Sequence, residues 1–160
     1  MKNGSLKLGM DLVPKTCWHE SLRKRMRRSE WDKLRRKVCA DQAGICAICG
    51  GEGRLQCHEK WRYDDAGHTQ TLVGFHAVCN MGHHVMHFGM AQILAEQGHL
   101  DLGAVIHHFM KVNHVGREAF QAHQEEAFRV YRERSKHVWK VDLGKWASLI
   151  SDRSAEAPPR

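Results

Sequence analysis

The cysteine and histidine residues between positions 46 and 87 constrain the fold of this chain more than any other feature. Cys46 and Cys49 flank a two-residue turn, and Cys79 follows thirty residues after Cys49. Three thiolates that converge in this way can bind one zinc ion, whereas a buried pair of structural cysteines is the simpler alternative. We interpret the pattern as a zinc knuckle that holds Cys46, Cys49 and Cys79 together.

The predicted knuckle lacks a fourth cysteine. Gly82 occupies the position that would complete a second C-x2-C pair after Cys79, and glycine has no side chain to offer. Tetrahedral zinc requires a fourth ligand, so His84 or His83 supplies it, water occupies the position, or the knuckle has lost its metal. The sequence leaves these alternatives open.

The segment between the knuckle cysteines has the pattern of a β-hairpin followed by a helix. Residues 54–63 alternate, residues 69–78 form a second β-rich run, and residues 64–67 supply the turn. After Cys79 the pattern becomes helical and continues to Gly98, with His83 and His87 one turn apart on one face. The predicted order is therefore knuckle, strand, strand, helix.

A second group of chemically capable residues lies on this hairpin and helix. His58 is flanked by Cys57 and Glu59 on the first strand, and two histidines at i and i+4 can bind one metal ion. Hydrolysis of a phosphodiester requires a base to accept a proton from water and a cation to stabilise negative charge. Because neighbouring strand residues point to opposite faces, Cys57 and His58 should have different roles in a regular strand.

The charge of the chain favours a polyanionic partner. Lys and Arg number 25 against 18 Asp and Glu, which gives a net charge of +7. Nine of the basic residues lie between Glu20 and Val38, where Ser29 and Asp32 have the spacing of a capping box and Trp31 begins an apolar face. The basic side chains of this helix either contact a row of phosphate groups or are simply exposed to solvent.

Targeting features and cysteine usage indicate a cytoplasmic protein. The first ten residues lack the apolar core of a signal peptide, and no apolar run approaches the length of a membrane span. The six cysteines are then expected to be reduced thiols available for metal binding, not a disulfide framework.

These motifs together resemble the HNH endonuclease family. The resemblance covers residues 43–90 and rests on four motifs: C-x2-C, C-H-E-K-W-R-Y-D-D, the run ending in F-H-A-V-C, and H-x3-H. The chain also resembles a narrower bacterial subgroup, through V-P-x2-C-W, W-D-x-L-R and R-x-R-S-K-H-x-W. It implies that His58 is the general base and that Cys57, His83 and His87 hold one divalent cation. Mg, Mn, Ni and Zn all remain open, and double-stranded DNA is the expected substrate.

Two departures from the family concern glycines. Gly82 replaces a knuckle cysteine, and Gly74 falls where many members have the asparagine that orients the base. His58 must then be oriented by another group, for which a backbone carbonyl or His76 is a candidate. A module of this shape that binds nucleic acid without cleaving it is the alternative function. A nuclease subunit of a larger defence or mobile-element assembly is another.

The predicted organisation is a single α+β domain with extensions. A ββα-metal core with a zinc knuckle is flanked by an N-terminal basic helix and C-terminal helices, through which a protein partner or a second copy could bind. The predicted parts are an N-terminal arm (1–19), a basic helix (20–42), the nuclease core (43–98), a C-terminal helical extension (99–150) and a flexible tail (151–160).

Overall fold

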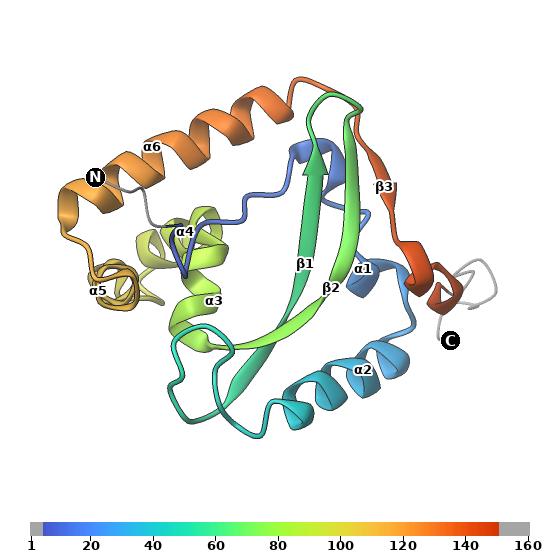
Figure 1. Ribbon diagram of the computed structural model, residues 1–160, viewed down its shortest axis with the longest axis horizontal. Helices are drawn as coiled ribbons and strands as arrows, with labels where there is room; N and C mark the ends of the chain where they lie inside the picture. The colour runs from blue at the N-terminus through green and yellow to red at the C-terminus, as the bar shows by residue number, and fades with distance from the viewer. Residues whose placement is uncertain (1–4, 151–160) are drawn as a thin grey trace.

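The computed structural model describes residues 5–150, and the predicted flexible tail and the first four residues of the predicted arm lie outside them. The fold is mixed α+β, as predicted (Figure 1). Its three-stranded sheet has the order β1-β2-β3. Among the described residues, no helix has both the length and the apolar character needed to cross a membrane.

The elements, in chain order, are η1 (Lys15–Cys17), α1 (Leu22–Arg25), α2 (Arg28–Asp41), β1 (Leu55–Asp64), β2 (Thr69–Cys79), α3 (Asn80–Met86), α4 (Phe88–Glu96), α5 (Leu102–Asn113), α6 (Arg117–Arg134), β3 (Lys140–Asp142) and η2 (Gly144–Leu149).

The predicted β-hairpin is confirmed. Strands β1 and β2 pair antiparallel, so that Leu55 lies opposite Cys79 and His58 opposite His76. The Asp64 carboxylate accepts hydrogen bonds from the backbone N–H groups of Ala66 and Gly67, which closes the turn. Because paired residues of two strands share a face, His58 and His76 project to the same side of the hairpin.

Two hydrophobic clusters pack against the hairpin. One contains Leu22 and Trp31 of α1 and α2 together with Leu72 of β2. The larger one includes Phe88 and Phe109 and joins the second half of the chain to the end of β2. Figure 1 accordingly shows α2 and the helices α3 to α6 on different sides of the hairpin.

The predicted basic helix is two helices, and its predicted capping box is wrong. Ser21 caps α1, Met26 is extended, and Arg27 precedes α2, so that Ser29 lies inside the second helix. An α-helix turns by about 100° per residue, so one straight helix would place Leu22 and Trp31 on opposite faces. The break allows both side chains to be buried in the same cluster.

The predicted helix from Cys79 to Gly98 is also interrupted. Helix α3 ends at Met86 and α4 begins at Phe88, and between them His87 has the non-helical angles φ −99° and ψ 49°. The C-terminal helical extension predicted for residues 99–150 contains the expected helices, α5 and α6, but its last part also contains a strand. There β3 pairs parallel with β2, with Lys140 opposite Thr69. This pairing depends on contacts distant in sequence, which a local pattern does not report.

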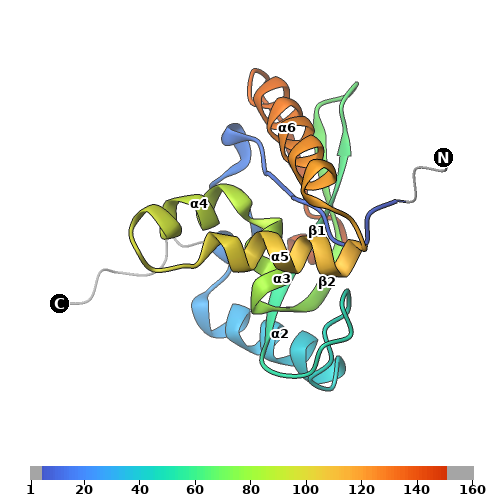
Figure 2. The same cartoon turned by 90° about the vertical axis from the view of Figure 1, so that its left-hand side faces the viewer.

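The N-terminal segment, predicted to be an arm, is held against the body of the protein by hydrogen bonds. The backbone N–H of Leu8 donates to the Asn113 side chain of α5, and that of Met10 donates to Nε2 of His123 in α6. The N–H of Asp11 donates to the carbonyl of Met86. The segment therefore crosses from the helices to the hairpin, as Figure 2 shows from the side. Asp11 lies between them, since it forms hydrogen bonds with Met86 of α3 and with His58 of β1.

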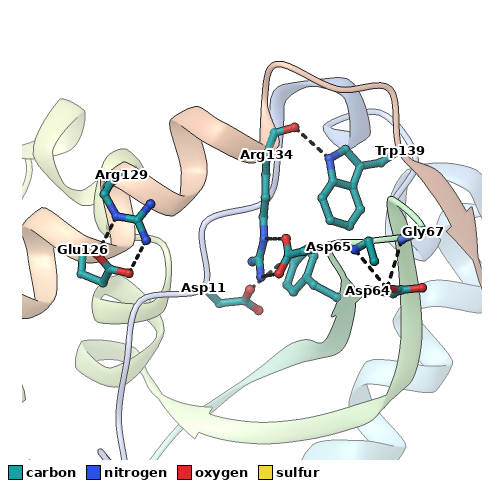
Figure 3. Close-up of polar contacts among 10 residues, drawn as sticks. Asp11, Asp64, Asp65, Gly67, Glu126, Arg129, Arg134 and Trp139 are labelled. Atoms are coloured by element: carbon teal, nitrogen blue, oxygen red, sulfur yellow. Dashed lines mark hydrogen bonds and ion pairs between the residues drawn. The ribbon is translucent and has the colours of Figure 1, made fainter.

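The turn of the hairpin is attached to the end of α6. Arg134 forms two hydrogen bonds to the Asp65 carboxylate, of 2.7 and 3.0 Å, and its carbonyl accepts a bond from the Trp139 indole (Figure 3). The guanidinium also lies over the Tyr63 ring, 4.1 Å from its centroid. These contacts fix the far end of β1 relative to the helices.

Candidate metal centres

Three histidines from separate parts of the core converge on one point. His58 comes from β1, His83 from α3 and His87 from the junction of α3 and α4. Each offers a ring nitrogen, and these atoms lie within 4.8 Å of one another. The three, which we call the imidazole trio, can therefore hold one metal ion.

The environment of His83 and His87 keeps these two rings of the imidazole trio uncharged. Burial, reinforced by the neighbouring imidazoles, lowers the pKa of His83 to about 3 and that of His87 to about 4. Both rings are neutral at pH 7 and have a nitrogen lone pair available, which is the form that binds metal ions.

Asp11 is the residue that orients His58. Its Oδ2 lies 3.1 Å from Nε2 of His58, and its Oδ1 accepts a 3.2 Å hydrogen bond from the Tyr63 hydroxyl. A His58 ring that donates from Nε2 keeps the lone pair of Nδ1 free for a metal ion or a proton. Sequence reasoning missed Asp11, because it lies 47 residues from His58 in a segment without a motif.

His76 lies beside the imidazole trio, but it is not one of its members. Its ring centroid is 5.4 Å from that of His58. Burial, together with the nearby His58 and Lys60, lowers the pKa of His76 to about 4. The orienting role considered for His76 falls to Asp11, which leaves His76 as a neutral imidazole at the edge of the site.

The structure does not bring Cys57, the ligand implied by the family resemblance, to this site. Cys57 packs against the cluster of Leu22 and Trp31, on the opposite face of β1 from His58. Burial, with smaller contributions from Cys39 and Glu59, raises the pKa of the Cys57 thiol to about 12. The alternation of strand residues thus separates the two side chains.

The three predicted knuckle cysteines are brought together. Cys46, Cys49 and Cys79 form a second group able to hold a metal ion, and the sulfurs of Cys49 and Cys79 are 3.8 Å apart. All three are free thiols. Backbone N–H groups point at each sulfur, from Cys49 to Cys46, from Gly51 to Cys49 and from Gly82 to Cys79. Such donors favour a thiolate. Although burial opposes it at Cys46, hydrogen bonding lowers the pKa of that thiol, whereas burial raises the pKa of the Cys79 thiol to about 12.

Neither predicted fourth ligand of the knuckle joins the three sulfurs. His83 belongs to the imidazole trio, and His84 is not part of either group. A residue that sequence reasoning missed lies beside one of the sulfurs, because Nε2 of His108 in α5 is 3.4 Å from the Cys79 sulfur, although His108 is not among the mutually close ligand atoms of the cysteine group. Burial lowers the pKa of His108, with help from Lys111 and His107, so this ring too favours its neutral form.

Comparisons with protein-family models, with curated proteins and with solved structures find no match for this chain. The two groups of side chains able to hold a metal ion are therefore the features that bear on its function.

Proposed function

We propose that this protein is a metal-dependent endonuclease of the HNH type that hydrolyses phosphodiester bonds of DNA. The observation that carries the proposal is the imidazole trio, which stands on a β-hairpin and the helix after it, with a carboxylate hydrogen-bonded to one of its rings. A divalent cation held there would stabilise negative charge on a phosphate and its leaving oxygen.

His58 is suited to either of two roles in this reaction. Held by Asp11 through Nε2, it has the geometry of a general base oriented by a carboxylate. Its position in the imidazole trio equally suits a third metal ligand. In the second case His76, neutral and on the same face of the hairpin, is the base nearest at hand. A metal ligand cannot accept the proton at the same nitrogen, so the two assignments exclude each other.

The donor set favours a transition metal over magnesium. Three imidazole nitrogens suit zinc or nickel, whereas magnesium prefers oxygen ligands and retains several waters. This preference does not depend on Cys57, which faces away from the trio.

One basic residue lies near this site and could contact a phosphate group of a nucleic acid. Arg23, at the start of α1, is exposed and contributes to lowering the pKa of both His83 and His87 after the effects of burial and the neighbouring imidazoles. The basic side chains of α2 are partly neutralised by ion pairs within the helix itself, namely Lys33–Glu30, Arg35–Asp32 and Lys37–Asp41. We therefore assign phosphate binding at the reaction centre to Arg23 rather than to α2.

A nicking assay tests the proposal. Supercoiled DNA is incubated with purified full-length protein in EDTA and then with Mg²⁺, Mn²⁺, Ni²⁺ or Zn²⁺, and the conversion to open circles is measured. We expect nicking with at least one metal, its loss in His83→Ala and its retention in His99→Ala. His99 is the matched control because it is exposed and lies outside both metal-binding groups.

The roles of His58 and His76 separate in the same assay. If His58 is the base, His58→Ala should still bind the metal but cleave about 10²–10⁴-fold more slowly. If it is a ligand, the variant loses the metal, and His76→Ala shows the slow cleavage instead. A parent protein that shifts DNA without ever nicking it would support the non-cleaving binding module, and one that does neither would refute both functions.

A further inference from the structure

Gly82 and His108 lie next to the same sulfur atom, that of Cys79. Gly82 is buried in α3, directly beside Cys79. A Cβ atom built there would lie 3.3 Å from the Cys79 sulfur and 3.9 Å from Nε2 of His108. The space that a side chain at position 82 would enter is therefore the space into which the His108 imidazole projects.

We propose that His108 is the fourth ligand of a structural zinc site with Cys46, Cys49 and Cys79. The ligand missing at position 82 is then replaced by one from α5, a helix outside the hairpin and α3. This inference is independent of the proposed nuclease activity, because the imidazole trio shares none of these four residues.

Two distances between these side chains agree with one tetrahedral ion. His108 is not among the ligand atoms that lie within 4.8 Å of one another in the cysteine group, so its ring must move closer to the other sulfurs when the ion binds. With Zn–S bonds of about 2.3 Å and Zn–N bonds of about 2.0–2.1 Å, tetrahedral angles separate two sulfurs by about 3.8 Å and a sulfur from a nitrogen by about 3.6 Å. The Cys49 and Cys79 sulfurs are 3.8 Å apart, and His108 Nε2 is 3.4 Å from the Cys79 sulfur. A disulfide would require about 2.0 Å between sulfurs.

The packing of α5 holds His108 in this position. Val105 and Phe109, on either side of it in the helix, are fully buried in the larger hydrophobic cluster. The amide of Asn113, farther along the helix, accepts from the Leu8 N–H and donates to the Leu8 carbonyl. Leu8 in turn approaches Gly82, with its Cδ1 3.9 Å from the built Cβ position. The α5 backbone at His108 is thus fixed beside the Cys79 sulfur before a metal binds, which reduces the entropy lost on binding.

Co²⁺ serves as the spectroscopic probe of this site in the full-length chain. Thiolate-to-cobalt charge transfer in the near ultraviolet arises only from the cysteine ligands, so it separates this site from the imidazole trio. We expect His108→Ala to bind Co²⁺ at least tenfold more weakly and to change the visible d–d bands. His107→Ala is the control, because His107 is exposed on the same helix and should leave both unchanged.

A second variant keeps the test decisive if His108→Ala does not fold. Gly82→Cys combined with His108→Ala restores four ligands, with the new thiol in the space left by the imidazole. We expect it to fold, to bind Co²⁺ with an affinity near that of the parent and to show stronger charge transfer. The proposal is overturned if His108→Ala keeps the affinity and spectrum of the parent, if the parent shows no thiolate charge transfer, or if the double variant fails to recover binding.

Discussion

The hydrogen bond between Asp11 and His58 leads to the most specific prediction about the proposed active site. Asp11 accepts from His58 and from the Tyr63 hydroxyl with its two different oxygens. In Asp11→Asn one of these oxygens becomes an NH2 group, which donates. Tyr63 can reverse its hydroxyl and accept, but His58 can accept at Nε2 only by moving its proton to Nδ1. The variant also removes a negative charge beside a ring that is only 5% exposed.

The expected effect on function is larger than the effect on stability. Replacing the partner that orients a metal ligand or a catalytic base typically costs about 10–100-fold in metal affinity or activity. Since asparagine keeps the size of the side chain and at least one hydrogen bond, we expect Asp11→Asn to lose no more than about 1 kcal/mol of unfolding free energy. Asp11→Ala leaves two donors without a partner, each worth about 1–3 kcal/mol when buried, so we expect a loss of about 2–6 kcal/mol.

The assay measures nicking rate, metal affinity and urea-induced unfolding for the parent and both variants. Asp41→Asn is the control, since it makes the same chemical change at an exposed ion pair with Lys37. If Asp11→Asn binds metal and cleaves like the parent, Asp11 does not orient His58 in the working site. If it instead unfolds as readily as Asp11→Ala, the carboxylate has a structural role only.

Two further predictions concern residues outside the trio. Cys57→Ala should leave the metal affinity of the trio unchanged, because the thiol packs in the hydrophobic cluster of α1 and α2, and it should cost about 1 kcal/mol of unfolding free energy. A clear loss of metal binding in isothermal titration would instead place Cys57 among the ligands. Burial lowers the pKa of His123 from 6.5, and its Nε2 accepts from the Met10 N–H. As the pH falls below about 6.5 the unfolded chain is protonated first at His123, as it is at His76, His83 and His87, so the unfolding free energy should fall. The share of His123 should be less than the one-proton limit of about 1.4 kcal/mol per pH unit, because its ring is partly solvated. His123→Gln, which accepts the same bond without titrating, should flatten this slope in urea titrations at pH 5 to 7, and an unchanged slope would contradict the assignment.

Local patterns predicted much of the central region. Alternation and turn residues placed both strands of the hairpin within one residue of their observed bounds, since the period of a strand is read from neighbouring residues. The same patterns failed at Met26 and His87, where a predicted helix is interrupted. At Met26 the burial of two side chains in one cluster overrides local helix propensity.

The sequence by itself determined which side chains with metal-binding chemistry are available and in what order. The spacing of Cys46, Cys49 and Cys79 was sufficient to predict that their three sulfurs form one cluster. Two of these residues share a tight turn, and the β-hairpin brings the third back beside them. The i, i+4 pair His83 and His87 likewise follows from the helical period.

Only the tertiary structure decided how each of these groups is completed. Asp11 reaches His58 across 47 residues and His108 reaches Cys79 across 29, because the N-terminal segment and α5 pack onto α3 and the hairpin. The pleat of β1 turns Cys57 into the hydrophobic cluster and His58 toward the other histidines. Contacts of this kind depend on how whole elements pack, so the same spacing in a different fold would not produce them.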